Sequence, residues 1–177
     1  MSLLHRIHSC IHAPPDPDPT QSHPWQGCLC RCRHSARLAH HRIQGARITH
    51  AAARRQHPVN AEDPFHTFLF ALSDGRYCID AGTGGNAARW INHRCAPNCE
   101  AVEDYDRQGI LRVYLHAKRL IHAGEELSFD YSLQFDHPAT EEDRRNYLCR
   151  CRSWNCRRTM LATVEVDGIA TPRKLCR

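Results

Sequence analysis

From residue 65 onward the chain shows short apolar runs of the kind that form strands, and at 110–116 apolar and polar side chains alternate with a period of two. Turn signals rich in Gly, Asp and Ser separate these stretches. The elements they predict are a hairpin of strands at 65–72 and 76–80 around the turn Ser73-Asp74-Gly75, a helical turn at 86–91, a strand at 110–116 and, after a turn at Gly124, a strand at 127–131. The pattern indicates a mainly β domain with short helices and irregular connections.

The first part of the chain has a different character. The run Pro14 to Pro19 carries four prolines and cannot hold a helix or a central strand, and nine of the 14 histidines precede Pro58. Three cysteines, Cys28, Cys30 and Cys32, also lie here with His34 close by, in a spacing that suits a metal ion. We expect residues 1–41 to be atypical, either poorly ordered or translated out of frame.

Composition and charge restrict the setting of the protein more than its function. The hydrophobic fraction of 41% and charged fraction of 24% are ordinary for a globular protein. The net charge of +5 is carried almost entirely by arginine, which could suit DNA or an acidic partner, but a solvated surface is the favoured interpretation. No apolar run approaches the ~20 residues that span a bilayer, and the N-terminal apolar stretch is too short for a signal peptide. We therefore expect a cytoplasmic, reducing setting, in which the 11 cysteines serve metal or core rather than disulfides.

Three cysteines near the C-terminus have the spacing of a metal site. Cys149 and Cys151 are separated by one residue, and Cys156 follows after four more. Three thiolates this close can share one tetrahedral Zn²⁺, whose fourth ligand must come from a distant part of the chain. Cys95 is the candidate for that ligand, with Cys99 in reserve. Such a bond would tie the C-terminal segment to the middle of the chain.

Four motifs then resemble the SET domain of protein-lysine methyltransferases. Gly85 to Cys99 reads Gly-Asn-Ala-Ala-Arg-Trp-Ile-Asn-His-Arg-Cys-Ala-Pro-Asn-Cys, which is similar to the family's Gly-Asn, Ala-Arg-Phe/Trp and Asn-His-Ser-Cys-x-Pro-Asn. Gly124 to Tyr131 resembles its second signature, Gly-Glu-Glu-Leu-x-Phe/Tyr-Asp-Tyr, and Ile79-Asp80-Ala81 its Ile-Asp-Ala. The three tail cysteines resemble the post-SET motif. The amino-acid sequence at 88–90 and 159–162 is most similar to that of bacterial members of the family.

The resemblance implies a fold and a reaction. The fold would be the β-clip of the SET domain, a pseudoknot-like arrangement of small sheets. The reaction would be methyl transfer from S-adenosylmethionine to a lysine side chain of a protein. The cofactors implied are S-adenosylmethionine and Zn²⁺, and the partner is a lysine-bearing protein, histone-like or other, with association with chromatin or the nucleoid in the cytoplasm and none with a membrane.

The resemblance also assigns roles to single residues. Tyr131 is the catalytic tyrosine and also contacts the cofactor, with a structural tyrosine at a strand end as the alternative. Phe129 lines the lysine channel, where the absence of a hydroxyl leaves room for di- or trimethylation. Asn92 and His93 contact the cofactor, unless they form a polar turn, and Arg89 lies beside the cofactor or in a surface ion pair. The zinc ligands would be Cys95 with the three tail cysteines. Asp130 is expected to support the turn rather than act as a base.

Departures from the family pattern concern mainly the N-terminal part. The opening Gly-x-Gly-Val-Phe and the later Glu-Tyr-x-Gly-Glu, which form part of the cofactor pocket, are absent as written, and Arg94 and Arg158 replace the usual Ser and Gly. A one-base shift allows Gly-Lys-Gly-Val-Phe-Ala at residues 25–30 and Glu-Tyr-Lys-Gly at 42–45. We hypothesise that roughly residues 24–45 are read out of frame, which the nucleotide sequence tests and which would make the Cys28 cluster meaningless as a metal site.

The domain boundaries expected from these motifs divide the chain into four parts. They are the atypical segment 1–41, a SET domain at 42–136 with a damaged opening, a post-SET zinc segment at 137–163 and a tail at 164–177. The competing function is a catalytically impaired remnant that serves as a zinc-stabilised protein-binding module. A basic zinc-containing nucleic-acid binder ranks last, because no recognition helix or basic strand with interleaved aromatics is present.

Overall fold

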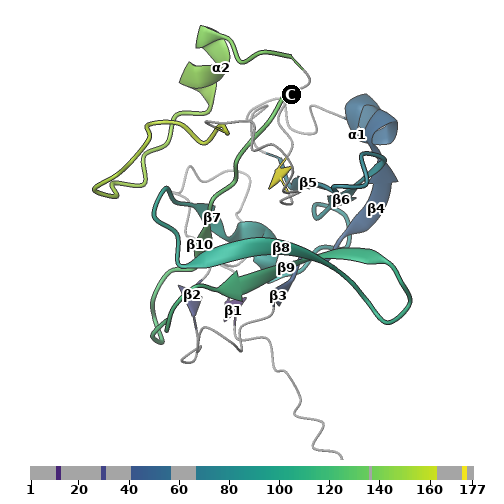
Figure 1. Cartoon of the computed structure of the whole chain (residues 1–177), viewed down its shortest axis with the longest axis horizontal. Coiled ribbons are helices and arrows are strands. Elements are labelled where there is room, and N and C mark those ends of the chain that lie inside the picture. Colours follow the sequence, from purple (N-terminus) through teal and green to yellow (C-terminus); the bar gives the residue numbers. More distant parts are fainter. Residues whose placement is uncertain are drawn as a thin grey trace, which may run out of the picture.

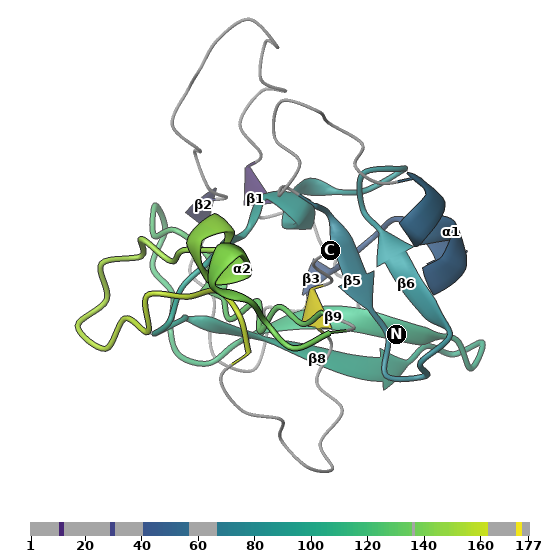
Figure 2. The same cartoon turned by 90° about the horizontal axis from the view of Figure 1, so that it is seen from above.

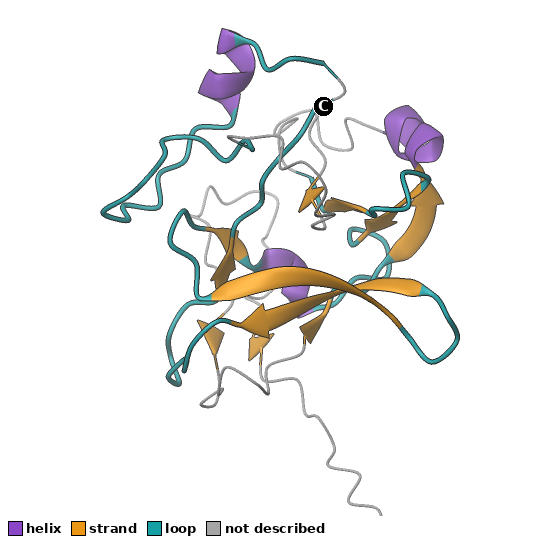
Figure 3. Cartoon of the chain, viewed as in Figure 1, coloured by secondary structure: helices purple, strands orange, loops and turns teal. Residues whose placement is uncertain are grey.

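The computed structural model describes residues 41–56, 67–135 and 137–162 in full, with the backbone of short strands at 11–12, 29–30 and 173–174. Within these residues the chain forms four small sheets and only short helices (Figures 1 and 3). The predicted fold class, mainly β with short helices, is therefore confirmed. The expectations for the Cys28 cluster and for residues 1–40 concern side chains that lie outside the described residues.

A three-stranded sheet contains the longest strands. Its order is β3 (His41–Arg42), β9 (Leu111–Ala117) and β8 (Cys99–Tyr105), all antiparallel. Burial along β9 alternates strictly, with Leu111, Val113, Leu115 and Ala117 inside and the residues between them half-buried. This alternation is the period-two pattern that predicted the strand, because successive side chains of a strand point to opposite faces.

A second sheet carries the predicted hairpin. Its order is β11 (Arg173–Lys174), β5 (Leu69–Ala71), β6 (Tyr77–Asp80) and β4 (Ala46–Thr49). The turn between β5 and β6 closes because the Asp74 carboxylate accepts hydrogen bonds from the backbone amides of Arg76 and Tyr77 at 2.9 and 3.0 Å. Gly75 follows with φ of +64°, a conformation that glycine adopts without steric cost. The hairpin prediction is confirmed. A separate pair, β1 (Ile11–His12) and β2 (Leu29–Cys30), is antiparallel.

The edge of this sheet was not predicted from the sequence. Strand β4 pairs along its whole length with β6 and runs directly into the helix α1 (His50–Gln56). Residues just before β4 also fit the fold as written. Ile43 is 1% exposed in the core, and a Cβ on Gly45 would lie 2.3 Å from the carbonyl oxygen of Asp80. Residues 43–45 belong to the proposed out-of-frame segment, a hypothesis that the nucleotide sequence tests.

Two distant segments of the chain come together in a short parallel pair. Strand β7 (Asn92–His93) lies beside β10 (Ser128–Phe129), with Asn92 opposite Ser128 and His93 opposite Phe129 (Figure 1). The approach to β7 depends on Gly85, where an added Cβ would lie 1.9 Å from the Ala81 carbonyl oxygen. The chain then passes through the 3₁₀ helix η1 (Ala87–Trp90), at the place where a helical turn was predicted.

The loop before β10 is held by an ion pair. The Glu125 carboxylate accepts hydrogen bonds from the Arg119 guanidinium, from the Asn98 side chain at 3.1 Å and from the His122 amide at 3.2 Å. Asn98 is 3% exposed and also accepts the amide of Ser128 in β10 at 2.9 Å. Through these contacts Glu125 connects the loop to the strand that precedes Tyr131.

Stability is expected to depend on Glu125 and on pH. Its hydrogen bonds with Arg119 lower the pKa of Glu125 from 4.5 to about 2. A lowered folded-state pKa stabilises the fold above the unfolded value of 4.5, and this contribution is lost as the pH falls towards 2. Glu125→Gln should therefore lower the Tm at pH 7, and the difference from the wild type should shrink between pH 4.5 and 2. Thermal melts across this range test it, with Glu100→Gln on the exposed face of β8 as control. A difference that persists undiminished at pH 2 would contradict the assignment.

The segment 137–162 folds back onto the chain after Tyr131. It corresponds to the predicted post-SET segment, and from here on the name tail refers to it and not to residues 164–177. It begins with α2 (Glu141–Asn146), whose N-terminus is fixed by a capping box between Thr140 and Asp143. The amide of Leu133 donates to the Met160 carbonyl at 3.0 Å, and that of Ala162 to the Leu133 carbonyl at 2.9 Å. Buried Leu133, Tyr147 and Leu161 form a small apolar cluster between them. Figures 1 and 2 show α2 and the tail at one end of the molecule, and α1 with β4 and β6 at the other.

The larger apolar core lies between the two main sheets and the β7–β10 pair. It contains side chains from each of these elements, among them Phe70, Ile79, Ile91, Val113 and Phe129, all at most 4% exposed. Among the described residues no helix combines the length and apolarity that a membrane crossing requires.

Candidate zinc centre and the adjoining tyrosine

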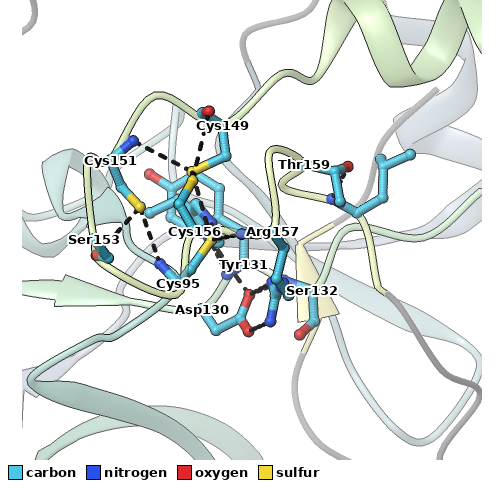
Figure 4. Close-up of polar contacts among 12 residues, drawn as sticks. Cys95, Asp130, Tyr131, Ser132, Cys149, Cys151, Ser153, Cys156, Arg157 and Thr159 are labelled. Atoms are coloured by element: carbon cyan, nitrogen blue, oxygen red, sulfur yellow. Dashed lines mark hydrogen bonds and ion pairs between the residues drawn. The ribbon is translucent and has the colours of Figure 1, made fainter.

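Four cysteine sulfurs meet between β7 and the tail. Cys95 lies two residues after the end of β7, and Cys149, Cys151 and Cys156 belong to the chain after α2. Figure 4 shows the four cysteines gathered together. Their Sγ atoms all lie within 4.8 Å of one another, with 3.6 Å from Cys95 to Cys149 and 3.7 Å from Cys156 to Cys149. A tetrahedral Zn²⁺ with bonds of about 2.3 Å separates its sulfurs by about 3.8 Å. The four-sulfur set therefore fits zinc in number, type and spacing.

Backbone amides point at these sulfurs. The Cys95 amide donates to Cys151 Sγ at 3.5 Å, the Cys151 amide to Cys149 Sγ at 3.4 Å, and the Arg157 amide to Cys95 Sγ at 3.4 Å. Burial raises the pKa of the Cys151 thiol, but the Cys95 amide and the Ser153 hydroxyl outweigh it and lower this pKa to about 6. At Cys151 these donors favour thiolate, the form that binds metal, whereas burial raises the pKa of the Cys95 and Cys149 thiols.

The reserve ligand is not part of the cluster. Cys99 begins β8, is 3% exposed and packs in the large core. Of the two cysteines in the first signature, the structure therefore brings only Cys95 to the three tail cysteines. The reason is the β7–β8 connection, which turns Cys95 towards the tail and Cys99 into the sheet.

His93 links a cluster cysteine to Tyr131. Its Nδ1 accepts the backbone amide of Tyr131 at 3.1 Å, and its Nε2 lies 3.4 Å from Cys95 Sγ. Because Nδ1 is an acceptor, a neutral ring carries its proton on Nε2, which faces the sulfur. The His93 side chain is 2% exposed, so this orientation is fixed by the interior.

Tyr131 follows β10 and is half-buried. Its hydroxyl donates to the Ile91 carbonyl at 2.7 Å, which fixes the direction of the ring. The ring lies 4.8 Å from that of Phe129, centroid to centroid, and Phe129 stacks on Phe70 at 6.2 Å. Phe129 is 2% exposed. The predicted catalytic and channel residues, Tyr131 and Phe129, thus lie in contact with each other.

The residues predicted to contact a cofactor lie on β7 and η1. The Asn92 side-chain amide donates to the Glu126 carboxylate at 2.8 Å, which leaves Oδ1 as its acceptor atom. The Arg89 guanidinium lies over the Trp90 ring at 4.9 Å and the Phe68 ring at 5.6 Å. The Ile91 carbonyl accepts the Tyr131 hydroxyl, and Asn92 Oδ1 and the Glu126 carboxylate are further oxygen acceptors close to the start of β7 and β10.

Two residues beside the tyrosine were not assigned to the site from the sequence. Arg157 donates from both guanidinium nitrogens to Asp130, at 2.5 and 2.8 Å (Figure 4). Burial raises the pKa of Asp130, yet the hydrogen bonds and charge of Arg157 outweigh it and lower this pKa below its usual value. Asp130 also accepts the Ser132 amide at 3.1 Å, consistent with the predicted role in the turn. The available signal for Arg157 was its place directly after the last tail cysteine.

Three further apolar residues of the tail, Trp154, Met160 and Leu161, lie outside the cysteine cluster. Trp154 is 94% exposed, so it covers nothing in the described structure. Leu161 is 3% exposed and Met160 packs beside it in the small apolar cluster. Both therefore serve the packing of the tail.

Comparisons with known proteins agree with this geometry. A family model described as the SET domain matches residues 23–132. This match begins before residue 42, the start expected from the motifs. Histone-lysine N-methyltransferase 2D of Homo sapiens is 35% identical over 117 residues, 66% of this chain but 2% of that protein. The H3 lysine-4 specific histone-lysine N-methyltransferase of Mycosarcoma maydis is 38% identical over 107 residues, 60% of this chain and 7% of that protein.

A solved structure gives the same picture for the fold. It is described as ctPRC2 in an autoinhibited conformation bound to S-adenosylmethionine, and it matches 59% of this chain with a TM-score of 0.54 and 29% sequence identity. This chain corresponds to 13% of that one. The chain therefore spans only a small part of the relatives it matches.

Proposed function

Because the chain belongs to the SET-domain family, we propose that it transfers methyl groups from S-adenosylmethionine to lysine side chains of proteins. The β7–β10 pair supports this proposal: Tyr131, whose hydroxyl donates to the Ile91 carbonyl at 2.7 Å, contacts His93 of β7 and lies against Phe129 of β10. The motifs that the sequence shows separately are one constellation in space.

The chain's own residues supply positioning rather than covalent chemistry. S-adenosylmethionine, when bound, supplies the electrophilic methyl group. The lysine nucleophile must be the neutral amine, whose pKa in water is about 10.4, and an apolar channel lined by Phe129 disfavours the ammonium form. The Tyr131 oxygen orients the amine and accepts weak C–H contacts from the methyl group. Holding nitrogen, carbon and sulfur in line lowers the barrier by proximity and orientation.

The same residues would hold the cofactor. Asn92, whose side-chain amide donates to Glu126, keeps Oδ1 as an acceptor, and an acceptor suits the cationic cofactor. We assign Arg89 and His93 to the border of this pocket. Cys95, Cys149, Cys151 and Cys156 would hold a structural Zn²⁺, whose closed shell leaves no position for substrate.

The proposed substrate is a lysine-bearing protein, histone or histone-like, which the chain would bind on chromatin or in the nucleoid. The named relatives act on histones, which supports this class. A reducing compartment such as the cytoplasm keeps the four cysteines available for metal. A bacterial-type member of the family, as the wording at 159–162 suggested, would use a nucleoid protein.

The direct test uses the purified full chain. Titration with S-adenosylmethionine should show saturable binding, and incubation with methyl-labelled cofactor and histones should transfer label to lysine. Stoichiometric zinc without cofactor binding would instead leave the protein-binding module as the function. Salt-sensitive DNA binding as the sole activity would favour the nucleic-acid reading.

Phe129 is expected to set the number of methyl groups added. Its buried ring leaves space where a hydroxyl would otherwise hydrogen-bond the amine. We expect the wild type to form di- or trimethyl-lysine and Phe129→Tyr to stop mainly at the monomethyl product. Mass spectrometry of a lysine peptide over time measures this, with Phe135→Tyr in the small apolar cluster as control. An unchanged product distribution would remove Phe129 from the channel.

A further inference from the structure

Arg157 contacts the cysteine cluster and the tyrosine segment at the same time. Its backbone amide donates to Cys95 Sγ at 3.4 Å. Its side chain forms the two-pronged ion pair with Asp130, the residue before Tyr131 (Figure 4). A single residue of the tail therefore reaches a metal-binding sulfur through its backbone and the site through its side chain.

Asp130 in turn determines the backbone around Tyr131. Its carboxylate accepts the Ser132 amide at 3.1 Å, so it closes a turn whose middle residue is the tyrosine. Ser132 has φ of +44°, a left-handed conformation that costs a non-glycine residue free energy. This turn needs the Asp130 carboxylate in place, and Arg157 is the cation that holds it there.

His93 completes the connection from the other side. Its Nδ1 accepts the Tyr131 amide, and its Nε2 lies 3.4 Å from Cys95 Sγ. Cys95, Arg157, Asp130, Tyr131 and His93 thus form a closed series of contacts, called the contact ring below. Tyr131 is reached from Cys95 along both arms of the ring.

The contacts of Arg157 also join groups of opposite charge. A zinc ion with four thiolates carries a net charge of about −2, and Asp130 is a second negative group nearby. The Arg157 guanidinium pairs with Asp130, while the backbone amide of the same residue donates to Cys95 Sγ at 3.4 Å, so one cationic residue contacts both groups. Without this cation, the metal-bearing tail and the Asp130 turn would repel each other.

We propose that Arg157 is a positioning residue for Tyr131, which makes the placement of the tyrosine depend on the seating of the metal-bearing tail. The catalytic consequence rests on the proposed function, whereas the structural coupling does not. The zinc cluster would then not only stabilise the tail but also set the backbone on which the tyrosine stands.

The experiment compares Arg157→Gln with Arg157→Lys and Arg158→Gln in the full zinc-loaded chain. Arg157→Gln removes the charge and the two guanidinium hydrogen bonds to Asp130 but keeps the backbone amide that faces Cys95. Arg157→Lys keeps the charge alone. Arg158 is the exposed neighbour and serves as the matched control. The measurements are zinc content, hydrogen exchange at the amides of Tyr131 and Ser132, and methylation kinetics.

We expect Arg157→Gln to retain one zinc per chain and to exchange about tenfold faster at both amides, the effect of losing a charged hydrogen-bonded pair. The kcat should fall by a similar factor with little change in the KM for cofactor. Arg157→Lys should recover part of both effects, and Arg158→Gln should match the wild type. The double variant Asp130→Asn/Arg157→Gln should be no worse than the worse single variant.

Unchanged exchange in Arg157→Gln, additive effects in the double variant, or an equal effect of Arg158→Gln would overturn the proposal. Loss of zinc in Arg157→Gln would also overturn it, because the residue would then support the metal rather than the tyrosine. If Arg157→Gln does not fold, Arg157→Lys decides by the same exchange measurement. A wild type without methyltransferase activity would refute the proposed function, while exchange and zinc content would still decide the coupling.

Discussion

Tyr131→Phe should lower kcat for methyl transfer by about 100-fold, while zinc content and cofactor affinity change little. The hydroxyl directs the ring through its 2.7 Å hydrogen bond to the Ile91 carbonyl, and its oxygen is the group placed to orient the lysine amine. Phenylalanine fills the same space without this oxygen, so binding is retained and alignment is lost. Steady-state kinetics with labelled cofactor and a lysine-bearing substrate measure the effect.

The matched control is Tyr105→Phe. Tyr105 ends β8 with 66% of its surface exposed, so loss of its hydroxyl should leave kcat unchanged. The zinc content of both variants shows whether the tail remains seated. If Tyr131→Phe keeps wild-type kcat, the tyrosine is structural, and the alternative of a strand-end tyrosine holds.

Cys95→Ser should abolish tight zinc binding and release the tail from the rest of the chain. The metal contributes roughly 10 kcal/mol in comparable structural sites, far more than the small cluster of Leu133, Tyr147 and Leu161 provides. A chelator should have the same effect on the wild type. We expect loss of the zinc signal, fast hydrogen exchange across residues 147–162 and a large fall in methyl transfer.

Cys99→Ala tests the choice between the two cysteines of the first signature. Cys99 is buried in the core, so this variant should lose some stability but keep one zinc per chain. Elemental analysis after dialysis separates the two outcomes. Stoichiometric zinc in Cys95→Ser, or its loss in Cys99→Ala, would show that the fourth ligand is misassigned.

Local patterns predicted the elements whose signals lie within a few residues. The β5–β6 hairpin followed from two apolar runs around Ser73-Asp74-Gly75, and β9 from its period of two. The helix α2 also carries a local signal, the capping box Thr140 to Asp143, which was not used. Strand β4 has no comparable signal, because it exists through its pairing with β6 some thirty residues away.

The candidate site was predictable to the extent that its residues form motifs. Most residues of the predicted site belong to sequence motifs: Tyr131, Phe129, Asn92 and the four clustered cysteines. The fold brings these motifs together through the β7–β10 pair and the cysteine cluster. Arg157 and Glu126 were not predictable as partners, because a lone Arg or Glu in a charged stretch is compatible with many ion pairs. Which ion pair forms depends on distances in the folded chain, and the spacing of residues along the sequence does not give those distances.

The amino-acid sequence alone determined the mainly β class, the family resemblance and the chemical types of the site, since these depend on side-chain pattern and residue identity. Only the tertiary structure decided that Cys95 rather than Cys99 joins the tail, that His93 lies between a sulfur and the tyrosine amide, and that Arg157 holds Asp130. The physical reason is that these contacts join residues up to 62 positions apart. Such contacts form only when the whole chain has closed, because closing each loop alone costs more entropy than one weak bond returns.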